Sequence, residues 1–188
     1  SRILSYPSED FRLLKQDMEE LLEETIGKDS LRENLIQSYA PLCELEATEL
    51  QKLYVETFDL KSNLGLYLTA HELGDSNRRG AALIKLQKVI NQAGFEKDNK
   101  ELADYIPMLF EFLTVAPKSV EVDRLMKRLA VAVSYMLQHI DRNNPYANIL
   151  DVLMRYVFKK PTKEEIKQLE DGREKADLEE LPYPIMYQ

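Results

Sequence analysis

The residues of this chain that could do chemistry lie in two stretches, 54–59 and 101–107, which combine aromatic and acidic side chains. In the first stretch, Tyr54 and Phe58 stand four residues apart, so both rings share one face of a helix. Asp59 then stands at the end of that helix. This arrangement suits a binding surface for a partner. The sequence leaves open a simpler interpretation, in which both rings belong to the core and Asp59 begins a turn.

The second stretch ends in a proline that restrains the residues before it. Pro107 has a fixed φ and pushes Ile106 toward an extended conformation. Glu101, Asp104 and Tyr105 are therefore expected on a restrained loop, where their side chains face a partner rather than the core. The alternative is that Asp104 only caps the following helix, by accepting hydrogen bonds from its first N–H groups.

Catalytic and metal-binding patterns are weak in this sequence. Cys43, His71 and His139 lie far apart and have no neighbouring ligand, whereas metal sites need several converging ligands at short spacings. A nucleophile with a paired base cannot be assembled from these residues. Neither of the standard glycine-rich phosphate loops occurs. We therefore expect a protein that is not an enzyme and that holds no metal or cofactor.

Composition favours a water-soluble protein with cationic partners. The chain has 188 residues, 44% hydrophobic and 31% charged, which suits one domain with a sizeable core. No apolar run approaches the roughly 18 residues of a membrane span. The net charge of −8 argues against nucleic acid and for basic peptides. A single cysteine suits a reducing compartment, so we expect the cytoplasm.

Helical spacing of apolar residues dominates the chain, and no stretch alternates with a period of two. Capping patterns at Ser30 and Thr48 predict helix starts, and Pro41 predicts a helix end. We predict an all-α, single-domain helical bundle of about eight to nine helices. The expected helices span about residues 11–26, 31–40, 49–58, 63–73, 79–93, 108–115, 122–137 and 146–157, with a short polar helix near 162–169.

The helical domain is expected over residues 1–169, with a division into two lobes hinged near 95–107 as an alternative organisation. Residues 170–188 form an acidic tail. Between Glu170 and Glu180 it carries six acidic and two basic side chains. A segment of this kind has little apolar surface to bury and is expected to be mobile.

The order of several motifs resembles that of the nitrate reductase delta subunit family. These proteins are molybdenum-cofactor assembly chaperones within the wider family of redox-enzyme maturation proteins. The resemblance covers roughly residues 3–158. Ala103 departs from the family pattern, which usually has a proline there. The matching motifs are Ile3–Pro7, Tyr54-x-x-x-Phe58-Asp59, Gly74-Asp75-Ser76, Arg79-Gly80 and Glu101–Pro107.

The resemblance implies a fold similar to that of redox-enzyme maturation chaperones and a cytoplasmic, non-catalytic function. The expected partner is the catalytic (alpha) subunit of a respiratory molybdenum nitrate reductase, bound through its N-terminal peptide. The chaperone would allow cofactor insertion before membrane docking, would not insert into the membrane, and would not remain in the finished enzyme. The client-binding residues expected from the resemblance are Tyr54, Phe58, Asp59, Tyr67, Glu101, Asp104, Tyr105 and Pro107.

Three other functions stay open at this point. The first is a nucleotide-dependent switch or an enzyme on a helical scaffold, which a saturable nucleotide titration would reveal. The second is a helical chaperone for a different molybdoenzyme client. The third is a generic helical adaptor. A pull-down with the reductase's N-terminal peptide separates the last two from the expected function.

Removing residues 170–188 should leave the helical domain folded, because the acidic tail offers no periodic apolar face to the core. The melting temperatures of the full and the shortened chain check this. A decrease of more than about 4 °C would show that the apolar end, Pro182–Tyr187, packs against the domain.

Overall fold

The computed structural model describes residues 1–95 and 101–168, which form an all-α bundle as predicted; no strand occurs in this part of the chain. Residues 163–168 are helical as well. The remaining elements are η1 (Arg2–Leu4), η2 (Glu9–Arg12), α1 (Leu13–Thr25), α2 (Asp29–Cys43), α3 (Ala47–Tyr54), the π-helical turn η3 (Val55–Asp59), α4 (Leu68–Leu73), α5 (Arg79–Gln92), α6 (Ile106–Val115), α7 (Val120–His139) and α8 (Tyr146–Tyr156).

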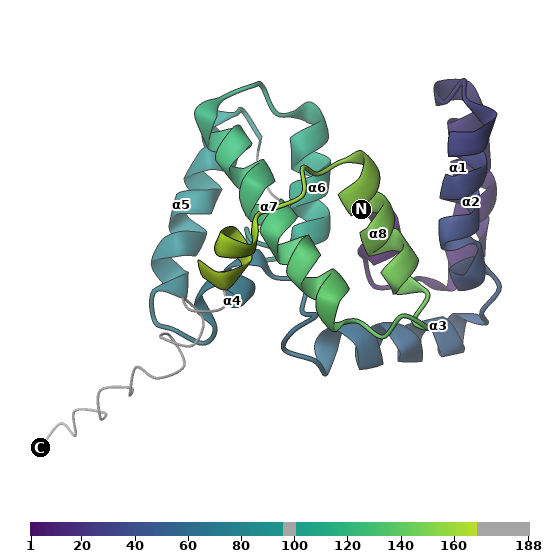
Figure 1. The fold of residues 1–188 in the computed structure, drawn as a ribbon, viewed down its shortest axis with the longest axis horizontal. Helices are drawn as coiled ribbons and strands as arrows, with labels where there is room; N and C mark the ends of the chain where they lie inside the picture. The colour runs from purple at the N-terminus through teal and green to yellow at the C-terminus, as the bar shows by residue number, and fades with distance from the viewer. Residues whose placement is uncertain (96–100, 169–188) are drawn as a thin grey trace, which may run out of the picture.

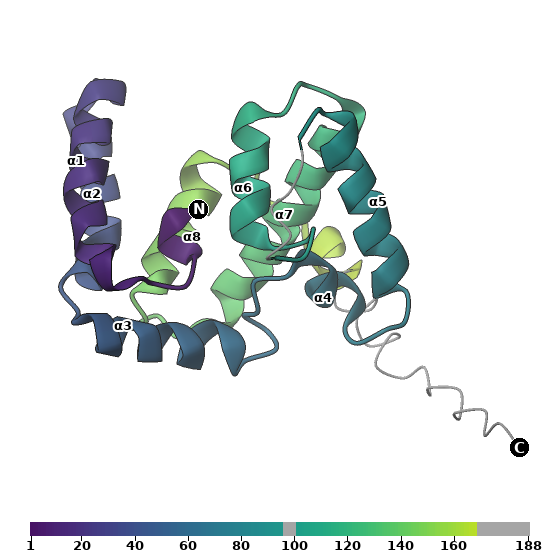
Figure 2. The same ribbon diagram turned by 180° about the vertical axis from the view of Figure 1, so that it is seen from behind.

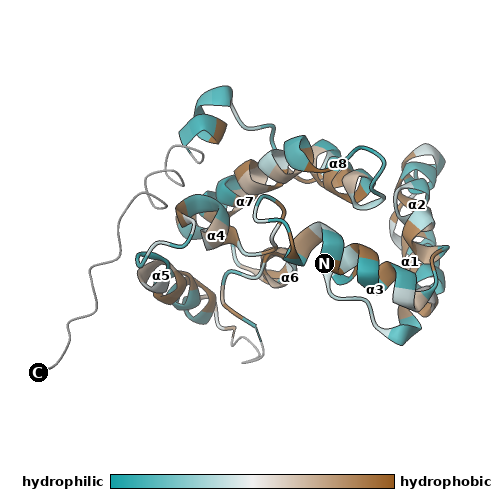
Figure 3. Ribbon diagram, turned by 90° about the horizontal axis from the view of Figure 1, so that it is seen from below, coloured by the Kyte–Doolittle hydropathy of each residue, from teal (hydrophilic) through white to brown (hydrophobic). Residues whose placement is uncertain are grey.

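Helix α7 lies at the centre of the larger group of helices. It packs against α4, α6 and α8 (Figure 1). Leu125, Leu129 and Val133 recur at four-residue steps and are at most 2% exposed, which places one stripe of α7 in the core. The Ser119 hydroxyl begins the helix by accepting a hydrogen bond from the N–H of Val122 at 3.2 Å. Figure 3 shows the hydrophobic residues of α6, α7 and α8 gathered toward the middle of the bundle.

Helices α1 and α2 form a hairpin at the opposite end of the molecule from α5, and α3 runs along the base between the two groups (Figures 1 and 2). Helix α2 packs against α1 and α8, so the hairpin is joined to the rest of the core through α2. No residue of α1 is fully buried. Leu13 and Leu21 of α1 are 64% and 57% exposed.

Two helices begin or end elsewhere than their local signals predict. The cap of α2 is Lys28 rather than Ser30, and that of α3 is Glu46 rather than Thr48. Helix α2 also continues through Pro41 to Cys43 instead of stopping before it. Pro41 has no N–H, so α2 loses one backbone hydrogen bond there, which is a small cost in the last turn of the helix. Burial of Leu42, which is 0% exposed, favours this last helical turn.

The largest difference from the prediction concerns the helix expected over 63–73. Only Leu68–Leu73 is helical, and the preceding residues are not. Leu64 and Leu66 are buried while Gly65 between them is not, an alternation that suits extended chain. The helix predicted over residues 63–67 is therefore wrong, because the apolar residues of this short segment follow a period of two rather than the helical period.

Two predicted features fall partly or wholly outside the described residues. Residues 96–100 belong to the predicted hinge, and residues 170–188 are the predicted acidic tail. Among the described residues, no helix is both long enough and apolar enough to cross a membrane.

Replacing Leu129 by alanine should lower the free energy of unfolding by about 2–5 kcal/mol, because the fully buried side chain leaves a cavity beside α7. Thermal or denaturant unfolding measures the change. Leu21→Ala on α1 is the control and should shift stability by less than about 1 kcal/mol, since Leu21 is largely exposed. Equal effects of the two substitutions would contradict the central place of α7.

Candidate functional site

The structure brings the two chemically suggestive stretches together around a short antiparallel pairing. Tyr67 and Tyr105 form an isolated β-bridge. Beside it, the N–H of Leu68 donates to the carbonyl of Asp104 at 2.9 Å. The pairing joins the residues before α4 to the residues before α6, so segments more than 30 positions apart share one surface.

Tyrosines and a carboxylate dominate the outer side of this pairing. The Tyr67 hydroxyl donates to Oε2 of Glu101 at 3.0 Å. The rings of Tyr67 and Tyr105 lie 5.6 Å apart, and the hydroxyls of Tyr105 and Tyr54 are 3.5 Å apart. Glu101 is exposed, whereas Tyr67 and Tyr105 are half-buried. Partial burial and the hydrogen bond to Glu101 raise the pKa of Tyr67 to about 12.

Tyr54 and Phe58 support this surface from behind. Their rings lie 5.1 Å apart, and the ring of Tyr146 on α8 lies 4.8 Å from Phe58. Tyr54 is 5% and Phe58 is 3% exposed, so the interpretation of both rings as core residues is correct. Burial raises the pKa of Tyr54. Asp59, at the end of η3, is exposed.

The sequence predicted that the Asp104 side chain faces a partner. In the structure this side chain is buried instead, at 0% exposed. Its Oδ2 atom accepts hydrogen bonds from the Thr69 N–H, at 3.1 Å, and from the Thr69 hydroxyl. The Arg79 guanidinium lies 3.8 Å from the same oxygen. Asp104 thus caps α4, a helix distant in sequence, and not α6, the helix that follows it. Pro107 is also buried, in the first turn of α6.

The N-terminal segment covers one side of the tyrosine group. The Tyr54 hydroxyl donates to the Leu4 carbonyl at 3.4 Å, and the Tyr6 ring lies edge-on to the Tyr54 ring at 5.4 Å. Tyr6 is 57% exposed. It also lines a surface pocket of about 450 Å³ between the N-terminal segment and the start of α1, together with Leu13 and Asp17.

The residues considered as metal ligands are separated. Cys43 lies in α2, His71 in α4 and His139 in α7. A His71 ring nitrogen is 2.6 Å from the carbonyl oxygen of Gly65. Within residues 1–95 and 101–168, no three His, Cys, Asp or Glu side chains are grouped so that they could hold a metal ion.

Thr69 and Arg79 contact the buried Asp104 carboxylate, and the sequence did not single them out as site residues. Arg79 belongs to the Arg79-Gly80 motif, so its place in the family pattern was a usable signal. No sequence motif marks Thr69, and the apolar spacing of the segment before it favours a helix. Its contact with Asp104 depends on the pairing of Tyr67 with Tyr105.

Comparison with known proteins identifies the family. Residues 14–142 match the family described as nitrate reductase delta subunit, which is more than half of the chain. The chain belongs to the nitrate reductase delta subunit family. The resemblance noted from the sequence motifs is thereby confirmed.

Similar members of the delta subunit family are named as assembly chaperones. The chain is 31% identical to the probable nitrate reductase molybdenum cofactor assembly chaperone NarJ of Bacillus subtilis, over 82% of this chain and 83% of that protein. It is 26% identical to NarJ of Escherichia coli K12, over 82% of this chain and 66% of that protein. Escherichia coli NarW is 23% identical, over 93% and 73%. These names describe chaperones rather than catalysts, in agreement with the expectation that this chain is not an enzyme.

Stability should fall as the pH rises above 10, in part because Tyr67 resists ionisation in the folded chain. Its folded pKa, about 12, exceeds the ordinary value of 10.0. The stabilising contribution is therefore complete below pH 10 and is lost as the pH rises through 12. Denaturant unfolding between pH 9 and 12 should show a smaller loss for Tyr67→Phe than for the unmodified chain. Parallel pH profiles would contradict this assignment.

Proposed function

We propose that this chain is a cytoplasmic assembly chaperone for a membrane-bound respiratory molybdenum nitrate reductase. It binds the catalytic subunit through that subunit's N-terminal peptide before the cofactor is inserted. While bound, it keeps the apo subunit open to cofactor insertion and delays docking to the membrane subunit. It then dissociates and is not part of the finished enzyme. The family membership and the names of the relatives support this proposal.

The observation that carries the proposal is the gathering of exposed or half-exposed aromatic and acidic groups on one rigid surface. Tyr67, Glu101 and Tyr105 come from two segments and are joined by a hydrogen bond and a ring contact. We call these three residues the tyrosine–glutamate surface. Tyrosine offers a large apolar ring with a polar tip, a combination that is enriched in binding surfaces. Cationic side chains bind favourably both to aromatic faces and to carboxylates.

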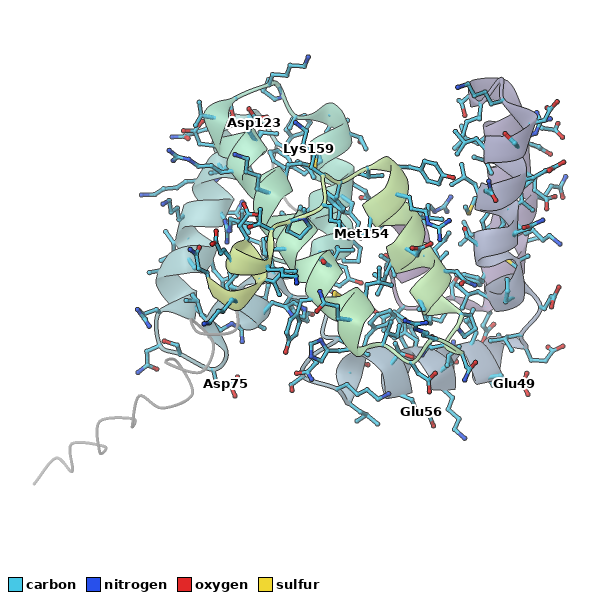
Figure 4. The ribbon with its side chains drawn as sticks, in the orientation of Figure 1. Glu49, Glu56, Asp75, Asp123, Met154 and Lys159 are labelled. Atoms are coloured by element: carbon cyan, nitrogen blue, oxygen red, sulfur yellow. The ribbon has the colours of Figure 1, made fainter. Side chains whose placement is uncertain are left out.

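Charge near this surface suits a basic peptide. Exposed Asp59 lies close enough to Tyr105 to act on its hydroxyl electrostatically, as does Glu101. Along the chain, residues 9–59 contain 14 acidic and 5 basic side chains. Glu49 and Glu56 project outward from the base of the molecule at α3 and η3 (Figure 4). An acidic surface of this kind attracts a cationic partner over a distance of about 10 Å at moderate ionic strength.

The roles of the eight residues expected to bind the client divide into two groups. Asp59, Tyr67, Glu101 and Tyr105 are accessible, and we propose that they touch the peptide. The other four are buried, and we propose that they support the surface; they are Tyr54, Phe58, Asp104 and Pro107. A binding surface without catalytic groups suits a protein that must release its client after maturation, because ordering a flexible peptide offsets part of the contact free energy.

A synthetic peptide with the N-terminal sequence of the reductase catalytic subunit should bind the chain in calorimetry, whereas duplex DNA should not. Affinity should fall with added salt. Tyr105→Ala should weaken binding by about tenfold, since a tyrosine anchor is removed. Glu101→Gln should weaken it by less than about fivefold, because glutamine keeps the acceptor for Tyr67 and loses only an exposed charge.

Glu121→Gln is the matched control, since it removes another exposed negative charge, from the first turn of α7. It should leave affinity unchanged. If the unmodified chain gives no heat with the peptide at low salt, the proposed function is wrong. If Glu121→Gln weakens binding as much as Glu101→Gln does, the binding surface lies elsewhere or only net charge matters.

A further inference from the structure

The carboxylate of Asp104 is a charged group placed entirely inside the protein. Asp104 is 0% exposed. Its Oδ2 accepts hydrogen bonds from the Thr69 N–H and the Thr69 hydroxyl and lies 3.8 Å from a guanidinium nitrogen of Arg79, whereas its Oδ1 has no hydrogen-bond partner among the described residues. Burying a carboxylate is costly unless donors and a positive charge replace water. The Arg79 Nε also donates to the Thr69 hydroxyl oxygen at 3.3 Å. These three side chains therefore form one connected group that tolerates little displacement.

The anchored residue lies immediately beside the tyrosine–glutamate surface. Asp104 precedes Tyr105 by one residue and follows Glu101 by three. Successive residues of an extended segment point to opposite sides, so fixing Asp104 inward directs Tyr105 outward. Across the pairing, buried Leu66 and Leu68 flank Tyr67, which is therefore directed to the same outer side.

Two backbone hydrogen bonds hold this register. The N–H of Leu68 donates to the Asp104 carbonyl, and the N–H of Ile106 donates to the Leu66 carbonyl, each at 2.9 Å. They lie on either side of Tyr105. A pairing of only this length has no neighbouring strands to stabilise it. The contacts of the Asp104 side chain with α4 and α5 supply the stabilisation that the pairing itself lacks.

We propose that Thr69 and Arg79 are positioning residues of the peptide-binding surface. They hold the Asp104 carboxylate and, through it, keep Tyr105 and Glu101 aligned with Tyr67. The inference rests on the proposed function for its binding consequence, but its structural consequence can be measured without any peptide. Neither residue touches the peptide. Both restrict the conformations of the surface before the peptide arrives, so that less conformational entropy is lost when it binds.

Thr69→Val and Thr69→Ser form the central pair of variants. Valine has the shape of threonine but lacks the hydroxyl donor to Asp104, whereas serine keeps it. Thr69→Val should weaken peptide binding by about tenfold in calorimetry, because Asp104 loses a hydrogen bond and Tyr105 is then held less firmly in place. Thr69→Ser should bind within about twofold of the unmodified chain. Amide hydrogen exchange at Leu68 and Ile106 should accelerate in the valine variant only.

Arg128→Met is the control for a general loss of stability. Arg128 makes a two-pronged ion pair with Glu72, both distances being 2.6 Å, and so ties α7 to α4. Its charge also acts on Asp104 electrostatically, but among the described residues its guanidinium donates to Glu72 and not to that carboxylate, so the methionine variant leaves the Thr69 contacts of Asp104 in place. It should lower the melting temperature while leaving peptide affinity within about twofold. Arg79→Met tests the same inference at a half-exposed position, should Thr69→Val fail to fold.

The outcomes separate this inference from the proposed function. Weaker binding and faster exchange in Thr69→Val, both restored by serine and absent from Arg128→Met, support the positioning role. If Thr69→Val and Arg128→Met weaken binding equally for equal loss of melting temperature, the role is only structural and the inference is overturned. If the unmodified chain does not bind the peptide, the proposed function fails. In that case amide hydrogen exchange at Leu68 and Ile106 is the remaining test of the positioning role. Exchange rates in Thr69→Val that equal those of the unmodified chain overturn the inference.

Discussion

The arrangement of the candidate surface depends on one buried charge, the carboxylate of Asp104. It joins the loop before α6 to the start of α4 through Thr69 and to the start of α5 through Arg79. Donors and a positive charge meet only its Oδ2, and Oδ1 has no hydrogen-bond partner among the described residues. Directional contacts of this kind are met in few arrangements of the neighbouring residues, whereas apolar contacts tolerate several. The restrained loop therefore owes its position to an electrostatic and hydrogen-bonding requirement, and Pro107 adds a local restriction of the backbone.

An aromatic group behind the surface links it to the rest of the bundle. Tyr54 contacts Tyr6 from the N-terminal segment, Phe58 from η3 and Tyr146 from α8. Its hydroxyl reaches Tyr105. The tyrosine–glutamate surface thus rests on the packed core, although its own residues are partly accessible. A surface supported in this way loses little conformational freedom when a flexible partner binds, which favours recognition without catalysis.

Much of the helical architecture was predictable because most of the helices have strong apolar periodicity. Helix α7 is an example. Its residues Leu125, Leu129 and Val133 are spaced four apart, which predicts a helix with one buried face, and all three are buried. Short segments were less predictable. Residues 63–67 contain apolar residues at spacings that suit both a helix and an extended chain, and pairing with a distant segment selected the extended form. The start of α3 at Glu46 reflects a different local capping box from the one predicted at Thr48, since the Glu46 N–H donates to Oε2 of Glu49 at 3.4 Å.

The helical class, the order of most helices, the family and the two motif-bearing stretches 54–59 and 101–107 follow from the amino-acid sequence alone. These follow from periodicity and motif order, which are local properties of the chain. Which of those residues are buried and which are accessible depends on how distant segments pack together in the folded chain. Asp104 and Tyr105 are adjacent in sequence, yet one is enclosed by Thr69 and Arg79 and the other reaches the surface. Burial depends on which distant segments pack against a residue, and no local pattern encodes that contact.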